Sequence, residues 1–198
     1  MKRGTGFAAA ASLIIAVLSP IPAQGAVPPS MKALVKDENR VSMDVAIDHN
    51  IDAVTAYRMT TSQKVPLVDV RTVQEYQLVG HAPSAYSIPA FVWGKWDEKK
   101  KAFGNDPNPD FVKQFSALFP DKKAPVIVMC RSGHRSGKAI KLLADAGYTN
   151  LYQMWEGFEG IPVSGADLPS SGMKIVDGWK NKGLPYTFDL DPKLVVVK

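Results

Sequence analysis

The sequence contains almost no cysteine, and this scarcity excludes several classes of site. Cys130 is the only cysteine among 198 residues, and there are three histidines. A single cysteine cannot form a disulfide within the chain, and it cannot supply a multi-cysteine zinc or iron–sulfur site. The histidines, His49, His81 and His134, are far apart in sequence. We therefore predict neither a metal site nor a bound cofactor.

Dense positive charge is missing as well. The formal net charge is +5, but no helix or stripe rich in lysine and arginine carries interleaved aromatic residues, so we predict no nucleic-acid partner. Hydrophobic residues make up 45% and charged residues 22% of the chain. These values are ordinary for a globular protein, and they argue against disorder, a collagen-like repeat or a coiled coil.

The first 25 residues have the pattern of a secretory signal peptide. A basic pair precedes an apolar run over 7–18, and Ala23 and Gly25 supply the small residues of a cleavage site. The alternative is an uncleaved membrane anchor, but the run is too short to span a bilayer comfortably. We therefore predict a periplasmic or secreted protein with no stable membrane span after the signal peptide, residues 1–25, is removed.

Short apolar runs alternate with helical stretches after residue 50. The runs predict buried strands at 65–70, 85–88, 124–130 and 150–154. The stretches between them predict helices at 51–59, 72–78, 109–119 and 137–146. Asn108 is expected to cap the third helix, with Pro109 as its first residue. This alternation predicts an α/β fold in which helices cover both faces of a parallel sheet, and ligands of such sheets bind beyond the carboxyl ends of the strands.

Three other regions lack a clear period. Residues 26–49 are polar and read as an extended lead-in. Residues 91–109 are rich in Lys, Asp, Asn, Gly and Pro, so we expect an exposed insertion. The tail over 187–198 ends in an apolar run, which we expect to form a strand or a docking segment.

Cys130 carries the strongest chemical signal in the sequence. It ends a predicted strand, and a predicted helix starts shortly after it. Unpaired N–H groups at a helix start favour negative charge, and Arg131, His134 and Arg135 can add positive charge. Such surroundings stabilise the thiolate, the nucleophilic form of cysteine, and they also bind small anions. The alternative is a structural cysteine packed like a small hydrophobic residue.

The loop from Cys130 to Ser136 resembles the active-site loop of the rhodanese (sulfurtransferase) domain family. Other segments similar to the family's motifs follow in the correct order: 67–71 with 75–76, 80–85 with 88–89, 147–152, and 178–179 with 183–185. The resemblance covers about residues 50–186. It implies a single α/β rhodanese-like domain with a five-stranded parallel sheet.

The resemblance also implies an activity. Cys130 is expected to take a sulfane sulfur from a small anionic donor such as thiosulfate and to become a persulfide. An acceptor, cyanide or a thiol, is then expected to remove the outer sulfur. A protein acceptor is left open. The expected substrate-binding residues are Arg131, Ser132, Gly133, His134, Arg135 and Ser136. Asp69 and Arg71 are expected to support the site.

Two other functions compete with this interpretation. Cysteine-dependent phosphatases are similar in fold but place five residues between cysteine and arginine, whereas four separate Cys130 from Arg135. The second alternative is a rhodanese-fold binding or redox module without turnover. Within the expected site, Asp69 either bonds to loop amides or caps the next turn, and we expect Arg71 to pair with Glu75. Residues 156–178 depart from the family pattern and are expected to form an extra loop near the catalytic rim.

Overall fold

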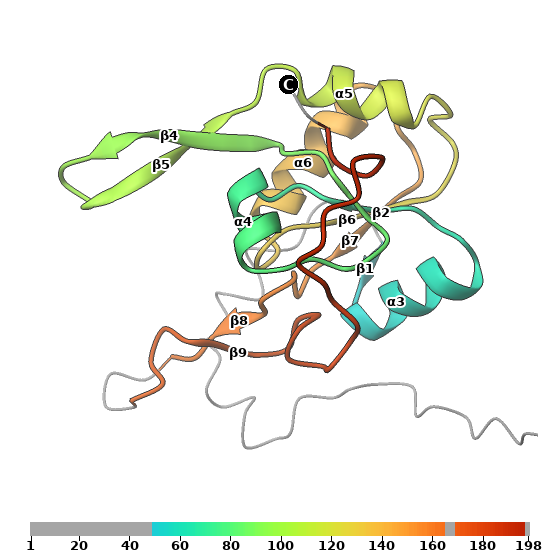
Figure 1. The fold of residues 1–198 in the computed structure, drawn as a ribbon. Coiled ribbons are helices and arrows are strands. Elements are labelled where there is room, and N and C mark those ends of the chain that lie inside the picture. The colour runs from blue at the N-terminus through green and yellow to red at the C-terminus, as the bar shows by residue number, and fades with distance from the viewer. Residues whose placement is uncertain (1–48, 165–168, 197–198) are drawn as a thin grey trace, which may run out of the picture.

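The computed structural model describes residues 49–164 and 169–196. The expected signal peptide and all of the expected lead-in except His49 lie outside these residues. A five-stranded sheet forms the centre of the fold, in the order β1-β7-β6-β2-β3, and every neighbouring pair is parallel (Figure 1). Its strands are β1 (Asn50–Ile51), β2 (Leu67–Asp69), β3 (Ala85–Ser87), β6 (Val126–Met129) and β7 (Leu151–Met154). The predicted parallel sheet is confirmed.

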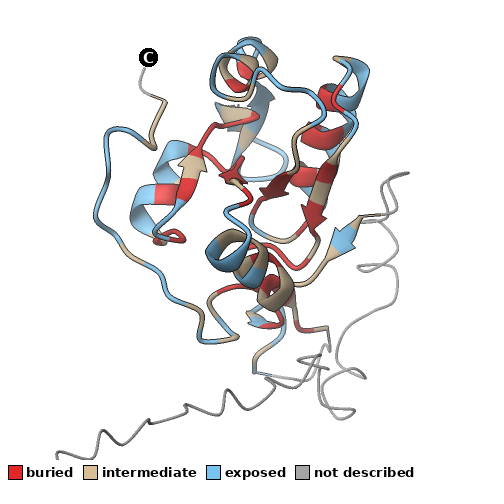
Figure 2. Cartoon of the chain, turned by 90° about the vertical axis from the view of Figure 1, so that its right-hand side faces the viewer, coloured by how far each residue is buried: buried red, intermediate tan, exposed pale blue. Residues whose placement is uncertain are grey.

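Helices cover both faces of this sheet, as predicted. Successive strand residues point to opposite faces. Val68 and Val128 belong to a core that includes residues of α5 (Phe111–Leu118) and α6 (His134–Asp145). Leu67, Ile127 and Met129 belong to a second core with residues of α3 (Ala53–Ser62) and α4 (Val73–Leu78). Buried residues accordingly concentrate on the sheet and on the inner sides of the helices (Figure 2).

Polar side chains cap the helices of the second core. Asp52 accepts a hydrogen bond from the backbone N–H of Thr55 at the start of α3, and Thr72 and Glu75 form a reciprocal capping box at the start of α4. The two residues before Asp52 form β1 instead of helix. That strand is two residues long, which is too short to show a period, so the sequence pattern assigned Ile51 to the helix.

The starts of α5 and α6 also differ from the sequence prediction. Helix α5 begins at Phe111 with Asp110 at its N-cap, so Asn108 is not the cap and Pro109 is not helical. The Asn108 side chain instead donates to the Pro89 carbonyl at 2.7 Å and accepts from the Asp110 N–H at 3.2 Å. Helix α6 begins three residues earlier than predicted, at His134.

The predicted insertion at 91–109 is a hairpin that projects from the body of the fold (Figure 1). It consists of β4 (Phe91–Asp97) and β5 (Ala102–Pro107), which pair antiparallel. Phe103 stacks on Trp93 with ring centroids 5.9 Å apart, and both rings are exposed. The exposure was predicted, but the strand pairing was not, because the lysine-, aspartate- and glycine-rich composition indicates loop.

A second hairpin and the tail complete the described chain. Strands β8 (Ile161–Pro162) and β9 (Lys174–Val176) pair antiparallel beyond the end of β7. The tail returns to the free edge of β3, where the Ser87 N–H donates to the Leu194 carbonyl at 2.7 Å. Within its described residues, the tail forms no full strand but two isolated bridges, a parallel one between Ser87 and Val195 and an antiparallel one between His81 and Thr187. No helix within the described residues is long and apolar enough to cross a membrane.

Candidate active site

The sheet presents Cys130 at the carboxyl end of β6. The residue directly follows Met129 and is only 1% exposed. Gly133 then turns the chain into α6 with a φ of 93°, a conformation that residues with a Cβ rarely adopt. Gly133 is the N-cap of α6 and has no side chain that could accept a hydrogen bond from the first N–H groups of the helix. These N–H groups can therefore donate to a bound anion.

Two buried side chains brace this loop from within. The hydroxyl of Ser136 and the amide nitrogen of Gln153 both donate to the Gly133 carbonyl, at 2.8 and 2.9 Å. The Ser136 hydroxyl therefore fixes the shape of the loop, and substrate binding by Ser136 stays a prediction. The sequence reasoning missed Gln153, although a lone polar residue within the apolar strand β7 is a detectable signal.

Arg135 is held by a carboxylate from across the sheet edge. Its Nη1 and Nη2 atoms each lie 2.6 Å from an oxygen of Glu75 on α4. Burial raises the pKa of Glu75, but hydrogen bonds and charge attraction from Arg135, together with hydrogen bonds from Thr72, outweigh it and lower this pKa to about 2. Glu75 is therefore ionised at neutral pH, and it both positions Arg135 and offsets part of its charge. The expected pairing of Glu75 with Arg71 is wrong.

Arg71 pairs instead with Asp69 beneath the site, and both side chains are fully buried. The Arg71 Nη2 atom lies 2.7 Å from Asp69 Oδ2 and donates to the Gly80 carbonyl at 2.7 Å. Asp69 also accepts from the Arg71 backbone N–H at 3.0 Å, which confirms turn capping. Among the described residues, no loop amide donates to Asp69, so the alternative expectation of bonds to the loop is not met. The pair supports the site through Phe158, whose ring lies 4.2 Å from the Arg71 guanidinium carbon.

The segment after β7 packs against the backbone of the loop. The Phe158 N–H donates to the Cys130 carbonyl at 2.7 Å, and the Glu159 N–H donates to the Arg131 carbonyl at 3.0 Å. Gly157 makes this approach possible, because a Cβ at that position would lie 2.3 Å from the Arg131 carbonyl carbon and oxygen. The start of the expected extra loop, residues 157–159, thus lies against the strand-to-helix turn and holds its backbone.

The remaining loop residues define the accessible side of the site. Arg131 and His134 are exposed, Ser132 is half-buried, and Gly133 is buried. An anion in solvent can therefore reach Arg131 and His134, whereas Arg135 already has a partner. A cleft of about 500 Å³ lies beside Arg131 and is also lined by Glu159, Lys174 and Lys180. The predicted loop thus places one thiol beside two arginines: Arg135, which is paired with Glu75, and Arg131, which has no ion-pair partner among the described residues.

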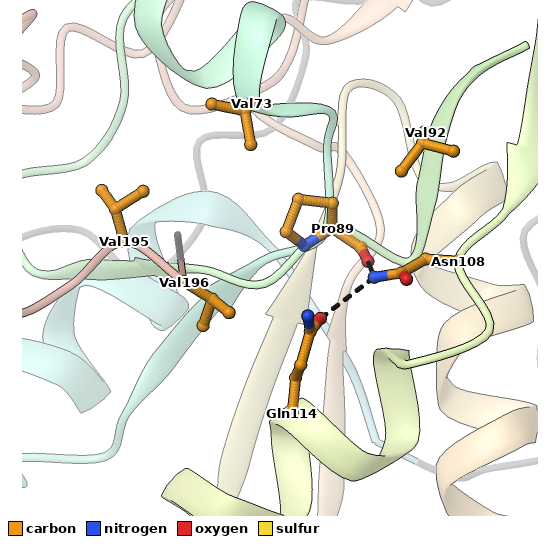
Figure 3. Close-up of a pocket in the computed structure, with 7 residues that line it drawn as sticks. All are labelled: Val73, Pro89, Val92, Asn108, Gln114, Val195 and Val196. Atoms are coloured by element: carbon orange, nitrogen blue, oxygen red, sulfur yellow. Dashed lines mark hydrogen bonds between the residues drawn. The ribbon is translucent and has the colours of Figure 1, made fainter. Parts of the chain in front are cut away.

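Other candidate features of the structure carry no chemistry of this kind. A pocket of about 240 Å³ lies between α4, the base of the first hairpin and the tail (Figure 3). Its lining is free of titratable side chains: Val73, Pro89, Val92, Asn108, Gln114, Val195 and Val196. His81 is buried, stacks on Tyr76 and bonds to its carbonyl at 3.1 Å, as expected for a structural histidine. The described residues contain no cluster of three metal-binding side chains.

Comparisons with known proteins identify the family of this chain. The model of the rhodanese-like domain matches residues 52–161. An uncharacterised protein of Rickettsia conorii is 33% identical over 141 residues, which span 70% of this chain and 97% of that protein. Thiosulfate sulfurtransferase 16, chloroplastic, of Arabidopsis thaliana is 36% identical over 98 residues, which span 50% of this chain and 74% of that protein.

A solved structure, that of Rv0390 from M. tuberculosis, shares 26% identity and has a TM-score of 0.47, covering 73% of this chain and 100% of that one. The family model matches more than half of the chain, and its range contains β2, β6, α6 and Cys130. The chain therefore belongs to the rhodanese-like domain family.

Proposed function

We propose that this protein is an exported sulfurtransferase that carries sulfur on Cys130. The position of Cys130 carries the proposal: the only thiol of the chain lies between the end of β6 and the start of α6. The N–H groups of that helix start and the nearby arginines favour the thiolate and the anions that react with it. A thiol packed only for stability has no need of such surroundings.

The first half-reaction forms a persulfide. The Cys130 thiolate attacks the outer sulfur of thiosulfate, a new S–S bond forms, and the old S–S bond breaks. The electron pair of the broken bond leaves with sulfite, so no oxidant or reductant is needed. This is nucleophilic catalysis in two steps, with the enzyme as the intermediate carrier. The N-terminal amides of α6 favour the negative charge that the persulfide keeps.

The two arginines have different parts in this proposal. Arg131 is exposed and has no carboxylate partner among the described residues, so it is suited to attract the donor and the departing sulfite. Arg135 is bound at both ends of its guanidinium by Glu75. It therefore adds a fixed positive charge beside the loop, while Glu75 limits how much of that charge an incoming anion meets.

Loop size supports sulfur transfer over phosphate chemistry. Four residues lie between Cys130 and Arg135, and the Gly133 carbonyl is held by two buried donors, which leaves the turn little freedom to widen. A tight turn suits a sulfur atom better than a phosphoryl group. We therefore expect negligible hydrolysis of aryl phosphates.

A transfer assay tests the proposed function. The protein should form thiocyanate from thiosulfate and cyanide, and Cys130→Ser should abolish the product because a serine hydroxyl cannot form a persulfide. Ser62→Ala, an exposed serine at the end of α3, is the control and should retain the activity of the wild type. Full transfer by Cys130→Ser would overturn the proposal. No turnover by the wild type would favour the binding or redox module instead.

A further inference from the structure

The cleft beside the catalytic loop is wider than a small sulfur donor requires. Its volume is about 500 Å³, within the range of about 300–1,000 Å³ that is typical of sites for metabolite-sized ligands. Thiosulfate is comparable in size to a few water molecules, each of which occupies about 30 Å³. The cleft therefore has room for a second and larger molecule beside Arg131, the residue that follows Cys130.

One wall of this cleft comes from outside the region matched by the family model. That region ends at residue 161, whereas Lys174 on β9 and Lys180 come after it. The cleft is also lined by Arg131 of the loop and by Glu159, whose backbone N–H donates to the Arg131 carbonyl. The second hairpin thus places residues particular to this part of the chain against the catalytic rim.

The cleft is strongly cationic, with one carboxylate among three basic side chains. Among the described residues, no carboxylate lies within ion-pair distance of Arg131 or Lys174. Lys180 lies over the ring of Tyr186 at 5.2 Å and has no ion-pair partner within the described ranges either. Glu159 contributes a buried carboxylate oxygen, Oε1, that has no hydrogen-bond partner in the described part of the chain. Within the described residues, the cleft therefore offers three cations without an ion-pair partner and one carboxylate oxygen without a hydrogen-bond donor.

Lys174 interacts electrostatically with Cys130 and with both loop arginines. Burial lowers the pKa of Lys174, and the nearby Arg131 and Arg135 lower it further, whereas Glu159 and Cys130 raise it. Lys174 thus lies within the field of both the catalytic thiol and the loop arginines. A bound carboxylate would relieve the repulsion among these cations.

We propose that this cleft binds the sulfur acceptor, and that the acceptor is a small amino-acid or peptide thiol with carboxylates and one ammonium group. Arg131, Lys174 and Lys180 would bind the carboxylates, and Glu159 would accept hydrogen bonds from the ammonium. This inference rests on the proposed function, because it names the class of molecule that removes the outer sulfur from the Cys130 persulfide.

The transfer step is balanced without a further reactant. The acceptor thiol loses its proton to solvent, and its sulfur attacks the outer sulfur of the Cys130 persulfide. A new S–S bond forms between acceptor and outer sulfur, and the bond to Cys130 Sγ breaks. The electron pair returns to Cys130 as thiolate, and the acceptor leaves as a persulfide.

Three acceptor thiols that differ in their charged groups test which charges the cleft binds. γ-Glutamylcysteine carries carboxylates and an ammonium, mercaptosuccinate carries carboxylates only, and 2-mercaptoethanol carries neither. At saturating thiosulfate, KM should be lowest for γ-glutamylcysteine and highest for 2-mercaptoethanol. Lys174→Gln should raise KM for both acidic thiols about tenfold relative to that for 2-mercaptoethanol, and Glu159→Gln should raise it for γ-glutamylcysteine alone. Lys113→Gln, an exposed lysine on α5, is the matched control and should change none of these values.

A binding measurement separates this inference from the proposed function. S-Methyl-γ-glutamylcysteine cannot accept sulfur, so its binding to the full chain, followed by calorimetry, needs no turnover. The inference requires binding that weakens about tenfold in Lys174→Gln and is unchanged in Lys113→Gln. Equal KM values for the charged and neutral thiols, or binding insensitive to Lys174, would overturn it. Binding as expected without thiosulfate turnover would instead overturn the proposed function and leave a thiol-binding module.

Discussion

Glu75 and Arg135 form a two-pronged ion pair across the catalytic edge of the sheet, with both N–O distances at 2.6 Å. Their side chains are 17% and 16% exposed, so water screens this pair only in part. Glu75 also caps α4 through Thr72, whereas Arg135 belongs to the first turn of α6. One carboxylate therefore connects the helices on the two faces of the sheet beside the loop that begins with Cys130.

This pair makes stability depend on pH in a defined direction. The pKa of Glu75 is lowered from 4.5 to about 2 in the folded state, so its contribution is complete above pH 4.5 and is lost as the pH falls towards 2. At 1.36 kcal/mol per pKa unit, the contribution is at most about 3 kcal/mol. Glu75→Gln should lower the free energy of unfolding by about 2–3 kcal/mol at pH 7, measured by urea denaturation. The difference from wild type should shrink between pH 4.5 and pH 2.

Glu98→Gln is the matched control for that experiment, because Glu98 is exposed in the first hairpin. Its unfolding free energy should stay within about 0.5 kcal/mol of wild type at every pH. A Glu75→Gln deficit that is constant from pH 7 to pH 2 would show that the ion pair is not its source.

The two loop arginines should respond differently to truncation. Arg131→Ala removes an exposed cation without a carboxylate partner in the described chain, so KM for thiosulfate should rise about tenfold with little change in stability. Arg135→Ala leaves the largely buried Glu75 unpaired, so it should cost about 2–3 kcal/mol of unfolding free energy. Steady-state kinetics and denaturation of both variants measure these effects. Identical behaviour of the two variants would contradict the separate roles.

Gly157 should be essential for the geometry of the loop. Gly157→Ala places a Cβ 2.3 Å from the Arg131 backbone, so the loop must shift and kcat should fall at least tenfold. Gly183→Ala is the matched control, since Gly183 has a similar φ of 68° but no atom within 4 Å of its Cβ position. Both variants carry the strain of a left-handed residue, about 1–2 kcal/mol. Equal activity in the two would show that the close approach at Gly157 does not shape the site.

The architecture was predictable because the strands are buried on both faces. The runs around Leu67 and Val126 are continuously apolar, which indicates parallel strands covered by helices. Strand β1 and the first hairpin lacked such a signal. Two residues cannot show a period, and a polar hairpin resembles a loop in composition.

The site was predictable as a segment but not as a set of contacts. Cys130 and its loop are contiguous in sequence, so the position of the thiol between a strand and a helix could be inferred directly. The pairing of Arg135 with Glu75 joins residues 60 positions apart, whereas a spacing of only four residues favoured Arg71 as the partner of Glu75. The bracing by Gln153 and the approach of Lys174 likewise depend on how separate elements pack.

Export remains a prediction from the sequence pattern of residues 1–25. The chain recovered outside the cytoplasm should begin near Ala26, as measured by N-terminal sequencing. Replacing Ala23 with a bulky residue such as phenylalanine should block cleavage, because the site requires small side chains. A mature pool that begins at Met1 would contradict the prediction of a cleaved signal peptide.

The most direct test of sulfur transfer through Cys130 is the intact mass of the protein before and after exposure to thiosulfate. Because Cys130 is the only cysteine, any persulfide must lie on it. We expect the mass to increase by one sulfur atom with thiosulfate and to return to its starting value with γ-glutamylcysteine or cyanide. Cys130→Ser should show no change. A wild-type mass that thiosulfate leaves unaltered would contradict sulfur transfer through Cys130.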